Sequence, residues 1–358
     1  MSSHDKQMDL VSDICQSATR TDRNLQNPIS LIVSRNSIWI AANRTGLIIR
    51  YDTHGCNRNS EHNIRVVSGS PVAVLKAPRK GFCITANMQN MQNMQNMQTG
   101  MQTNVQIGMQ TMHSDLIVVT SSGSLEGYNR CLNADSTIVA TTTNTTGSVT
   151  APSVRGYTGA TLHNGHLYVA NHSNGSIDVF DCNWTLVRVI VDNSLRNNGY
   201  HPLNVVSYRK HLFVTNTFFG TTTPTTSMTT TMNNLTNNIG NGYVSMYGHC
   251  FDTPIRLISR GPLSIPYGIA FIDDKMYVSN NGNGTISIFD IRESPTIYDK
   301  PTIYDKHKAR YLTNLETPEG GAIINDGIWS IVIKDSVLWL VAGNQQGAHG
   351  TLTLIPLR

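Results

Sequence analysis

The chain has 358 residues, and its composition is 39% hydrophobic but only 14% charged. The formal net charge of +4 comes from scattered lysines and arginines, which indicates no nucleic-acid partner, because phosphate binding needs clustered cations. No apolar run approaches the ~20 residues of a membrane-spanning helix, so no membrane span is predicted. The N-terminus lacks the apolar region of a secretory signal, which predicts a cytoplasmic or virion-associated protein.

The first predicted repeat begins near Asn27 and contains four short strands. An apolar strand from Asn27 to Val33 precedes a hairpin from Ile38 to Asp52, which reads IWIAANRTGLIIRYD. Period-two alternation on both sides of a Gly-containing turn is typical of two antiparallel strands. A fourth strand is predicted from Ile64 to Val67.

The same unit recurs along the chain. Similar hairpins read LIVVTSSGSLEGYN from Leu116, HLYVANHSNGSIDVFD from His166 and KMYVSNNGNGTISIFD from Lys275. Six repeats begin near Asn27, Ser70, Gly156, His201, Ile265 and Asp326. Four strands at a period of roughly 40–60 residues are typical of propeller blades, which bury enough surface only when they stack in a ring. The predicted fold is therefore all-β, a six-bladed β-propeller of four-stranded antiparallel blades.

The last repeat has three strands of its own, predicted over Ile328 to Ile333, Val337 to Val341 and Gly350 to Leu357. The N-terminal strand from Met8 to Ser12 is expected to complete this blade, because that pairing would close the ring and remove an open sheet edge. Residues 1–358 are accordingly expected to form a single propeller domain.

Two low-complexity segments interrupt the repeats. Segment 87–113 is rich in Met, Gln and Asn, and its three-residue period matches neither helix nor strand. Segment 220–240 is rich in Thr and Asn. Both are predicted to be loop insertions, the first of them disordered, and a copper or partner site is the alternative for the Met-rich segment.

The four tryptophans divide into two groups. Trp39, Trp329 and Trp339 fall within predicted strands and are expected to be buried between blades. Trp184 lies at a turn, and it is expected to be exposed.

Motifs along nearly the whole chain carry a resemblance to a known family. They include Asp9-Leu-Val-Ser-Asp, Leu167-Tyr-Val-Ala-Asn, Ser176-Ile-Asp-Val-Phe-Asp and Gly261-Pro-Leu-Ser-Ile-Pro-Tyr-Gly-Ile-Ala. With these motifs the chain resembles an uncharacterised, mostly bacterial family of NHL-related six-bladed propellers. The resemblance implies the fold but no function, because the family has no established activity. Ile29-Ser30 stand where the family has Trp-Gly, so a role for that aromatic at the pore is not carried over.

The sequence contains no G-x-S-x-G, H-E-x-x-H or P-loop motif, so no catalytic residue, metal or cofactor is predicted. Candidate ligand-binding residues follow from the fold, because the starts of the inner strands converge on the central channel of a propeller. These candidates are Asn27, Asn171, His201, Asn204, Asn280 and Asp326. The alternative is that the asparagines cap strands and fill turns, since Asn readily bonds its local backbone.

Three functions are open on the sequence alone. The first is a non-enzymatic scaffold, expected to be a monomer, that binds a protein or glycan partner. The second is a metal-dependent, lactonase-like hydrolase with its site at the central channel, although divalent cations prefer several carboxylates to a set that is nearly all Asn. The third is a virion or surface structural protein. The Met-Gln-Asn tract and the Asn/Thr bias are also similar to those of proteins from large DNA viruses or from protists with AT-rich genomes, which bears on the origin of the chain.

Overall fold

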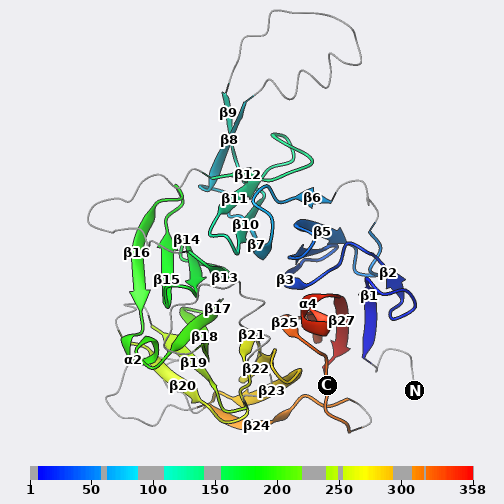
Figure 1. The fold of residues 1–358 in the computed structure, drawn as a ribbon, viewed down its shortest axis with the longest axis vertical. Coiled ribbons are helices and arrows are strands. Elements are labelled where there is room, and N and C mark those ends of the chain that lie inside the picture. Colours follow the sequence, from blue (N-terminus) through cyan, green and yellow to red (C-terminus); the bar gives the residue numbers. More distant parts are fainter. Residues whose placement is uncertain are drawn as a thin grey trace, which may run out of the picture.

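The computed structural model describes residues 7–57, 63–87, 109–140, 155–219, 239–248, 253–292, 309–317 and 320–357. The strands of these residues form six antiparallel blades that stand side by side in a ring (Figure 1). Five blades have four strands each, and the sixth carries a fifth strand at its outer edge. The predicted six-bladed propeller is confirmed.

The first strand of each blade lies nearest the centre of the ring. These strands are β3 (Pro28–Val33), β7 (Pro71–Lys76), β13 (Tyr157–His163), β17 (Tyr200–Tyr208), β21 (Pro266–Ile272) and β25 (Ile328–Lys334). Each of them contacts the first strands of both neighbouring blades, so the contacts run around the complete ring. Three of the strands begin with proline, which is tolerated there because the first residue of a strand needs no ladder hydrogen bond.

The second and third strands of each blade are covered by the neighbouring blades. The second strands are β4 (Ile38–Ala42), β10 (Leu116–Thr120), β14 (His166–Asn171), β18 (His211–Phe218), β22 (Lys275–Asn280) and β26 (Val337–Ala342). The third strands are β5 (Leu47–Tyr51), β11 (Leu125–Tyr128), β15 (Ser176–Phe180), β19 (Gly242–Tyr247), β23 (Thr285–Asp290) and β27 (Thr351–Pro356). Burial on both faces explains the nearly continuous apolar runs, such as LIVVT in β10, where every residue is buried.

The outer strands are more exposed than the inner ones, and two of them are very short. Five of them are β6 (Ile64–Arg65), β12 (Ile138–Val139), β16 (Leu186–Val191), β20 (Ile255–Ser259) and β24 (Arg310–Asn314). Two of these have only two residues each, which limits the open edge that they present to other strands.

The N-terminal strand β1 (Met8–Ser12) completes the last blade. It pairs antiparallel with β27, with Met8 opposite Leu354 and Ser12 opposite Thr351. The Asp9 carboxylate also accepts a hydrogen bond from the Thr353 hydroxyl at 2.6 Å. Strand β2 (Arg20–Thr21) adds a parallel partner outside β1. The predicted closure of the ring by the N-terminal strand is confirmed.

In several blades, an aspartate or asparagine directly after the third strand caps the turn that follows. The Oδ1 atom of Asp52 accepts two backbone N–H groups of its turn at 2.9 Å, and Oδ1 of Asp181 does the same at 2.9 Å. Asn129 accepts one such N–H group at 2.9 Å. The recurrent aromatic-plus-Asp or aromatic-plus-Asn ending of the hairpins therefore reflects side chains that cap turns.

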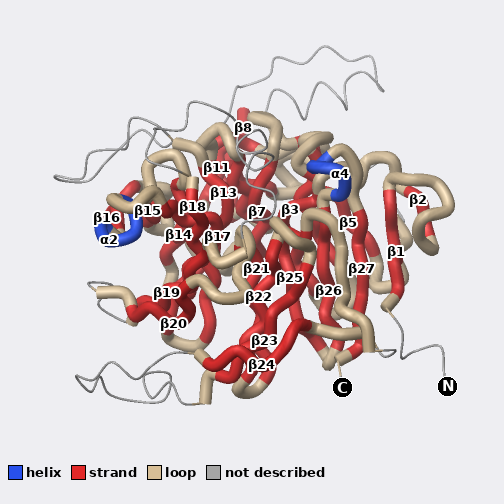
Figure 2. Tube along the Cα trace, turned by 60° about the horizontal axis from the view of Figure 1, so that its bottom comes forward, coloured by secondary structure: helices blue, strands red, loops and turns tan. Residues whose placement is uncertain are grey.

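The strands run between two faces that are covered by loops (Figure 2). The top face carries the loops that enter the first strands and those between the second and third strands, such as 43–46. The short helices α2 (Asn193–Arg196) and α4 (Asn344–Gly347) belong to loops of this face. The bottom face carries the loops between the first and second strands, such as 34–37, and those after the third strands, such as 52–57. No helix that the structure describes is long and apolar enough to cross a bilayer.

A two-stranded hairpin, β8 (Cys83–Asn87) and β9 (Met109–His113), is inserted between β7 and β10 and projects from the ring (Figure 1). The ends of the predicted 87–113 loop, Asn87 and Met109–His113, are thus in strands, because Ile84 pairs with Met112 and packs on blade 2. Residues 88–108 lie outside the described residues. Of the predicted 220–240 insertion, only Ile239 and Gly240 are described, and they form a turn.

The inserted hairpin buries Trp184. The expected exposure of this residue is wrong, since its side chain is only 4% exposed. Its indole N–H donates to the carbonyl oxygen of Cys83 at 2.8 Å, and its ring meets Phe82 edge to face at 5.0 Å. Trp329 and Trp339 are buried as expected, and Trp39 is half-buried.

Candidate functional site

Most of the predicted site residues lie at the top face. Asn27, His201 and Asp326 are at or just before the starts of first strands, and Asn171 and Asn280 end second strands. Asn204 lies further along β17, within the channel. The structure therefore distributes these residues around the ring and does not gather them into one cluster.

The asparagines of the second strands tie parts of one blade together. The Nδ2 group of Asn171 donates to a carboxylate oxygen of Asp178 at 3.0 Å, and Nδ2 of Asn280 donates to the Ser287 hydroxyl at 2.9 Å. Asn216, at the same place in blade 4, contacts the Ser245 hydroxyl at 3.4 Å. In each case the partner belongs to the third strand, so these asparagines have a structural role.

The same asparagines also hold the loops that enter their blades. Oδ1 of Asn171 accepts the backbone N–H of Gly156 at 3.4 Å, and Oδ1 of Asn280 accepts that of Ser264 at 3.0 Å. Both side chains are fully buried. The interpretation of these residues as strand and turn caps therefore has direct support in their hydrogen bonds.

Asn27 and Asn204 connect neighbouring blades. Asn27 has a positive φ of 45°, and its Oδ1 accepts the indole N–H of Trp329 at 3.0 Å, which joins the first blade to the last. The Nδ2 group of Asn204 donates to the carbonyl oxygen of Tyr267 at 3.3 Å and so joins blades 4 and 5. Asp326 is exposed, and its carboxylate accepts the backbone N–H of Gln345 at 2.6 Å in the α4 loop.

His201 belongs to a small aromatic cluster between blades 3 and 4. Its ring lies 5.5 Å from that of His172 and 6.1 Å from that of Phe219, and its Nδ1 lies 2.6 Å from the carbonyl oxygen of His172. His172 is 4% exposed, and neither of its ring nitrogens has a hydrogen-bond partner among the described residues. Burial, with a smaller contribution from His201, lowers the pKa of His172 to about 3, so this ring is neutral at pH 7.

The central channel contains a cavity of about 390 Å³ that is lined mainly by apolar side chains of the first strands. Asn204 is the one predicted site residue among the described residues that line it. None of these lining residues carries a carboxylate, so they do not fit a calcium-like ion. No three His, Cys, Asp or Glu side chains in the described part of the chain lie close enough together to hold a metal ion.

A larger cavity of about 770 Å³ opens on the bottom face between blades 1 and 2, and we call it the blade 1–2 cleft. Its lining comes from the ends of strands and from the turns of both blades. The lining residues are Ile32, Ser34, Asn36, Ser37, Trp39, Arg50, Tyr51, Asp52, Thr53, His54, Cys56, Asn57, Ile64, Lys76, Asp115, Leu116, Tyr128 and Arg130.

The cleft combines an apolar floor with aromatic walls. Ile64 and Leu116 are buried in the core cluster between the two blades, and Trp39 packs against the same cluster. The Arg50 guanidinium lies 5.2 Å from the centre of the Trp39 ring, as in a cation–π contact. Tyr128 is mostly buried, and its hydroxyl donates to the carbonyl oxygen of Ala134 at 3.2 Å.

The charges of the cleft divide into occupied carboxylates and unpaired cations. Asp52 caps its own turn, and Asp115 accepts the backbone N–H of Arg130 at 3.4 Å. Arg50, Lys76 and Arg130 are exposed, and within the described residues no carboxylate forms an ion pair with any of them.

The sequence did not indicate this cleft, because its lining is assembled from two blades, and in blade 2 the inserted hairpin separates Lys76 from Asp115 along the chain. A partial signal was present in the first hairpin. Trp39 and Arg50 are directly opposite in the β4–β5 register, so an aromatic ring and a cation were already predictable neighbours.

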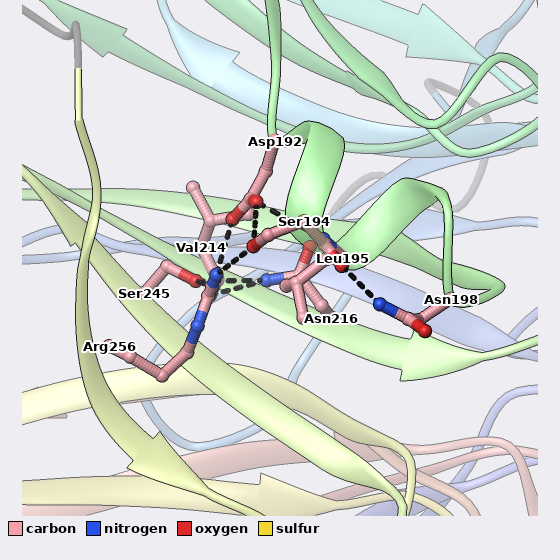
Figure 3. Close-up of polar contacts among 8 residues, drawn as sticks. All are labelled: Asp192, Ser194, Leu195, Asn198, Val214, Asn216, Ser245 and Arg256. Carbon is pink, nitrogen blue, oxygen red and sulfur yellow. Dashed lines mark hydrogen bonds and ion pairs between the residues drawn. The ribbon is translucent and has the colours of Figure 1, made fainter.

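A second polar network, at the junction of blades 3 and 4, is fully occupied by its own contacts (Figure 3). Arg256 of β20 donates to Asp192 at 2.7 Å, to the Ser194 hydroxyl at 3.1 Å and to the Ser245 hydroxyl. Asp192 also accepts the backbone N–H of Leu195 at 3.2 Å and thereby caps α2. These contacts attach the outer strand of blade 4 to the segment that links blades 3 and 4, which indicates a structural role.

The chain matches no protein-family model, so the expected relationship to NHL propellers stays a prediction. It is 24% identical over 302 residues to "Uncharacterized protein L690" of Acanthamoeba polyphaga mimivirus, which covers 78% of this chain and 70% of that protein. It is 23% identical over 356 residues to "Uncharacterized protein R648" of the same virus, which covers 92% of this chain and 80% of that protein. These relatives are viral, whereas the resemblance in the sequence pointed mainly to bacterial proteins.

Two solved structures are similar to this chain in fold. Hydrazine synthase of Kuenenia stuttgartiensis has a TM-score of 0.53 at 12% identity, with 96% of this chain and 98% of that chain covered. The RRP9 WD40 repeats have a TM-score of 0.50 at 10% identity, with 99% and 98% covered. At such low identity the similarity shows the propeller fold alone.

Proposed function

We propose that this protein is a non-enzymatic β-propeller that binds a glycan in the blade 1–2 cleft. The observation that carries this proposal is the composition of the cleft, in which the half-buried ring of Trp39 and an apolar floor lie beside hydroxyl, amide and charged groups. Binding sites for small ligands typically combine an apolar surface with a few polar groups that fix orientation.

A sugar ring matches this arrangement because it has an apolar face and a polar rim. Trp39 offers an apolar surface, while the side chains of Asn36 and Thr53 offer donors and acceptors along the cleft. The volume of about 770 Å³ lies in the range of pockets that enclose most of a small ligand. The cleft is therefore large enough to take a short oligosaccharide.

Isothermal titration of the protein against a panel of defined oligosaccharides tests the proposal. Trp39→Ala is expected to weaken binding about tenfold or more, since loss of about 1.4 kcal/mol of contact energy is a factor of ten. Tyr311→Ala is the matched control, because Tyr311 is an aromatic residue that is 43% exposed on β24 of blade 5. Absence of binding to every glycan, or equal loss in the two variants, would contradict the proposal.

The hydrolase alternative places its ligand at the central channel, near Asn27, Asn171, His201, Asn204, Asn280 and Asp326. Hydrogen bonds between protein groups already occupy several of these side chains, which favours the binding protein over the hydrolase. Thermal melting with and without a chelator separates the two ideas. A chelator-dependent fall in melting temperature, together with turnover of an ester or lactone, would support the hydrolase.

The similarity to mimivirus proteins supports the further idea that the protein belongs to a viral particle or to an infected cell. Mass spectrometry of purified particles tests this idea directly. Recovery in stoichiometric amounts would favour a structural component of the virion, and a glycan-binding cleft is compatible with that place.

A further inference from the structure

We infer that the blade 1–2 cleft selects an acidic glycan, whose carboxylate or sulfate groups are bound by Arg50, Lys76 and Arg130. This inference rests on the proposed function and adds a ligand class and the residues that determine specificity. It follows from three features of the cleft, which are the pairing of its charges, their positions on the two blades and the chemistry of the guanidinium group.

The cleft is suited to an anion because its carboxylates are hydrogen-bonded and its cations are not in ion pairs with a described carboxylate. Both carboxylates of its lining accept backbone N–H groups, Asp52 from its own turn and Asp115 from Arg130. The three cations make no ion pair with a carboxylate of the described residues. A ligand that brings carboxylate or sulfate groups would supply the missing partners, and hydrogen bonds between two charged groups are stronger than those between neutral ones.

The positions of the cations place them around one ligand. Arg50 comes from β5 of blade 1, whereas Lys76 ends β7 and Arg130 follows β11 in blade 2. All three line the same cleft, so the two blades contribute positive charge from opposite sides. Burial raises the pKa of the Tyr128 hydroxyl, while Arg130 and Arg50 oppose this rise and Asp115 and Asp135 add to it.

The placement of Arg50 suits a ring that carries an acid group. Its guanidinium lies against the Trp39 ring at 5.2 Å, which restricts the side chain before a ligand arrives. Arginine presents donors in a planar fork that matches carboxylate and sulfate oxygens, so a restrained arginine loses less entropy on binding. A sugar that packs on the aromatic wall would thus bring its acid group beside Arg50.

Titration calorimetry with three named probes tests the inference. These are a hyaluronan hexasaccharide, a heparin-derived hexasaccharide and the neutral chitin hexasaccharide. The acidic probes are expected to bind at least about tenfold more tightly than the neutral one, with an affinity that falls as salt rises. Preference for hyaluronan identifies uronate carboxylates as the recognised groups, and preference for heparin identifies sulfates.

The double variant Arg50→Gln/Arg130→Gln is expected to lose most of this preference, so that its affinities for the acidic and neutral probes converge. Lys210→Gln/Lys275→Gln is the matched control, because it removes two exposed cations from the bottom ends of blades 4 and 5. The control is expected to bind all three probes as the unaltered protein does.

The outcomes separate this inference from the function on which it rests. Equal affinity for neutral and acidic probes would overturn acid selectivity but leave a glycan-binding cleft. Equal losses in the two double variants would overturn the assignment to Arg50 and Arg130, since only the net charge would then matter. If no hexasaccharide binds, or if only an acidic peptide such as oligoglutamate binds through Arg50 and Arg130, both the inference and the proposed function fail.

Discussion

The top face of blades 3 to 5 and the blade 1–2 cleft use polar side chains in opposite ways. At the top face, Asn171 and Asn280 each bond a buried polar group of the third strand and the loop that enters the blade. In the cleft, Arg50 and Arg130 are exposed and form no ion pair with a described carboxylate. The polar residues that repeat from blade to blade at the top face therefore tie the strands and loops of their own blades together, whereas Arg50 and Arg130 have no ion-pair partner among the described residues.

The third strands show a related difference between blade 1 and the other five blades, at one buried position. This position lies two residues before a large apolar or aromatic residue at or next to the end of the strand, and it is fully buried in every blade. It is occupied by Ile49, Glu126, Asp178, Ser245, Ser287 and Thr353. Five blades thus have a polar group there, while blade 1 has an apolar one and presents its polar groups to the cleft instead.

The largest effect is expected for Asp178, which accepts hydrogen bonds from Tyr157, Asn171 and Ser176 at 3.0–3.1 Å. Asp178→Ala would remove the shared acceptor of these three buried donors, and it is expected to reduce the free energy of unfolding by about 3–5 kcal/mol. Denaturant unfolding measures this loss. The control Ser287→Ala removes a smaller neutral group and should cost about 1 kcal/mol. Equal losses of stability in the two variants would contradict the idea that the buried hydrogen bonds of Asp178 stabilise the top face.

A smaller loss of stability is expected on acidification, because His172 is the top-face residue whose ring has no hydrogen-bond partner among the described residues. Its pKa is about 3 in the folded protein instead of the usual 6.5, so the unfolded chain binds a proton that the folded chain does not. The stability that the neutral ring contributes is therefore present above pH 6.5 and is lost as the pH falls toward 3. The expected loss is about 1.4 kcal/mol per pH unit, or about 2 kcal/mol at pH 5.

Unfolding curves at pH 7 and pH 5 for the unaltered protein and for His172→Leu check this expectation. The variant should lose less stability between the two pH values, because leucine has no proton to gain. His166→Leu is the control, since His166 is only half-buried and its Nδ1 lies 3.1 Å from the carbonyl oxygen of Asn164. Identical pH dependence in all three proteins would show that His172 is not the titrating group.

An effect of about 1–2 kcal/mol is expected for Arg256→Met at the junction of blades 3 and 4. The Arg256 side chain is 22% exposed, and its removal leaves Asp192 without its cation. Arg292→Met is the matched comparison, because Arg292 also binds an aspartate, Asp290, but its side chain is 65% exposed. Exposed ion pairs contribute about 0–1 kcal/mol, so the second variant should remain close to the unaltered protein. A reversed order in denaturant unfolding would contradict the structural role of Arg256.

The fold was predictable from the sequence because every blade repeats one local pattern. Period-two alternation gave the strands, and the pairing of Met8–Ser12 with the last blade followed from the missing fourth strand of that blade. The exposure of Trp184 was not predictable in the same way, since the hairpin that covers it lies about a hundred residues earlier in the chain and has no counterpart in the other blades.

The candidate site was less predictable, because the polar residues that recur from blade to blade stabilise the fold. Asn171 and Asn280 stood out through their repetition, yet their partners are protein groups of the same blade. Asn27 meets Trp329 only after the ring has closed, across 302 residues of sequence. The cleft depends on two blades meeting at their bottom ends, and no local pattern encodes that meeting.

The smallest effect on stability is expected in the blade 1–2 cleft. Arg50→Gln and Arg130→Gln should each change the free energy of unfolding by no more than about 0.5 kcal/mol, since neither guanidinium is buried or paired with a described carboxylate. Denaturant unfolding of each variant, beside its affinity for an acidic hexasaccharide, gives both quantities for the same protein. A stability loss of about 2 kcal/mol or more would place these arginines among the residues that hold the blades together. Unchanged stability with weakened binding would instead show that Arg50 and Arg130 contribute to ligand binding and not to the stability of the fold.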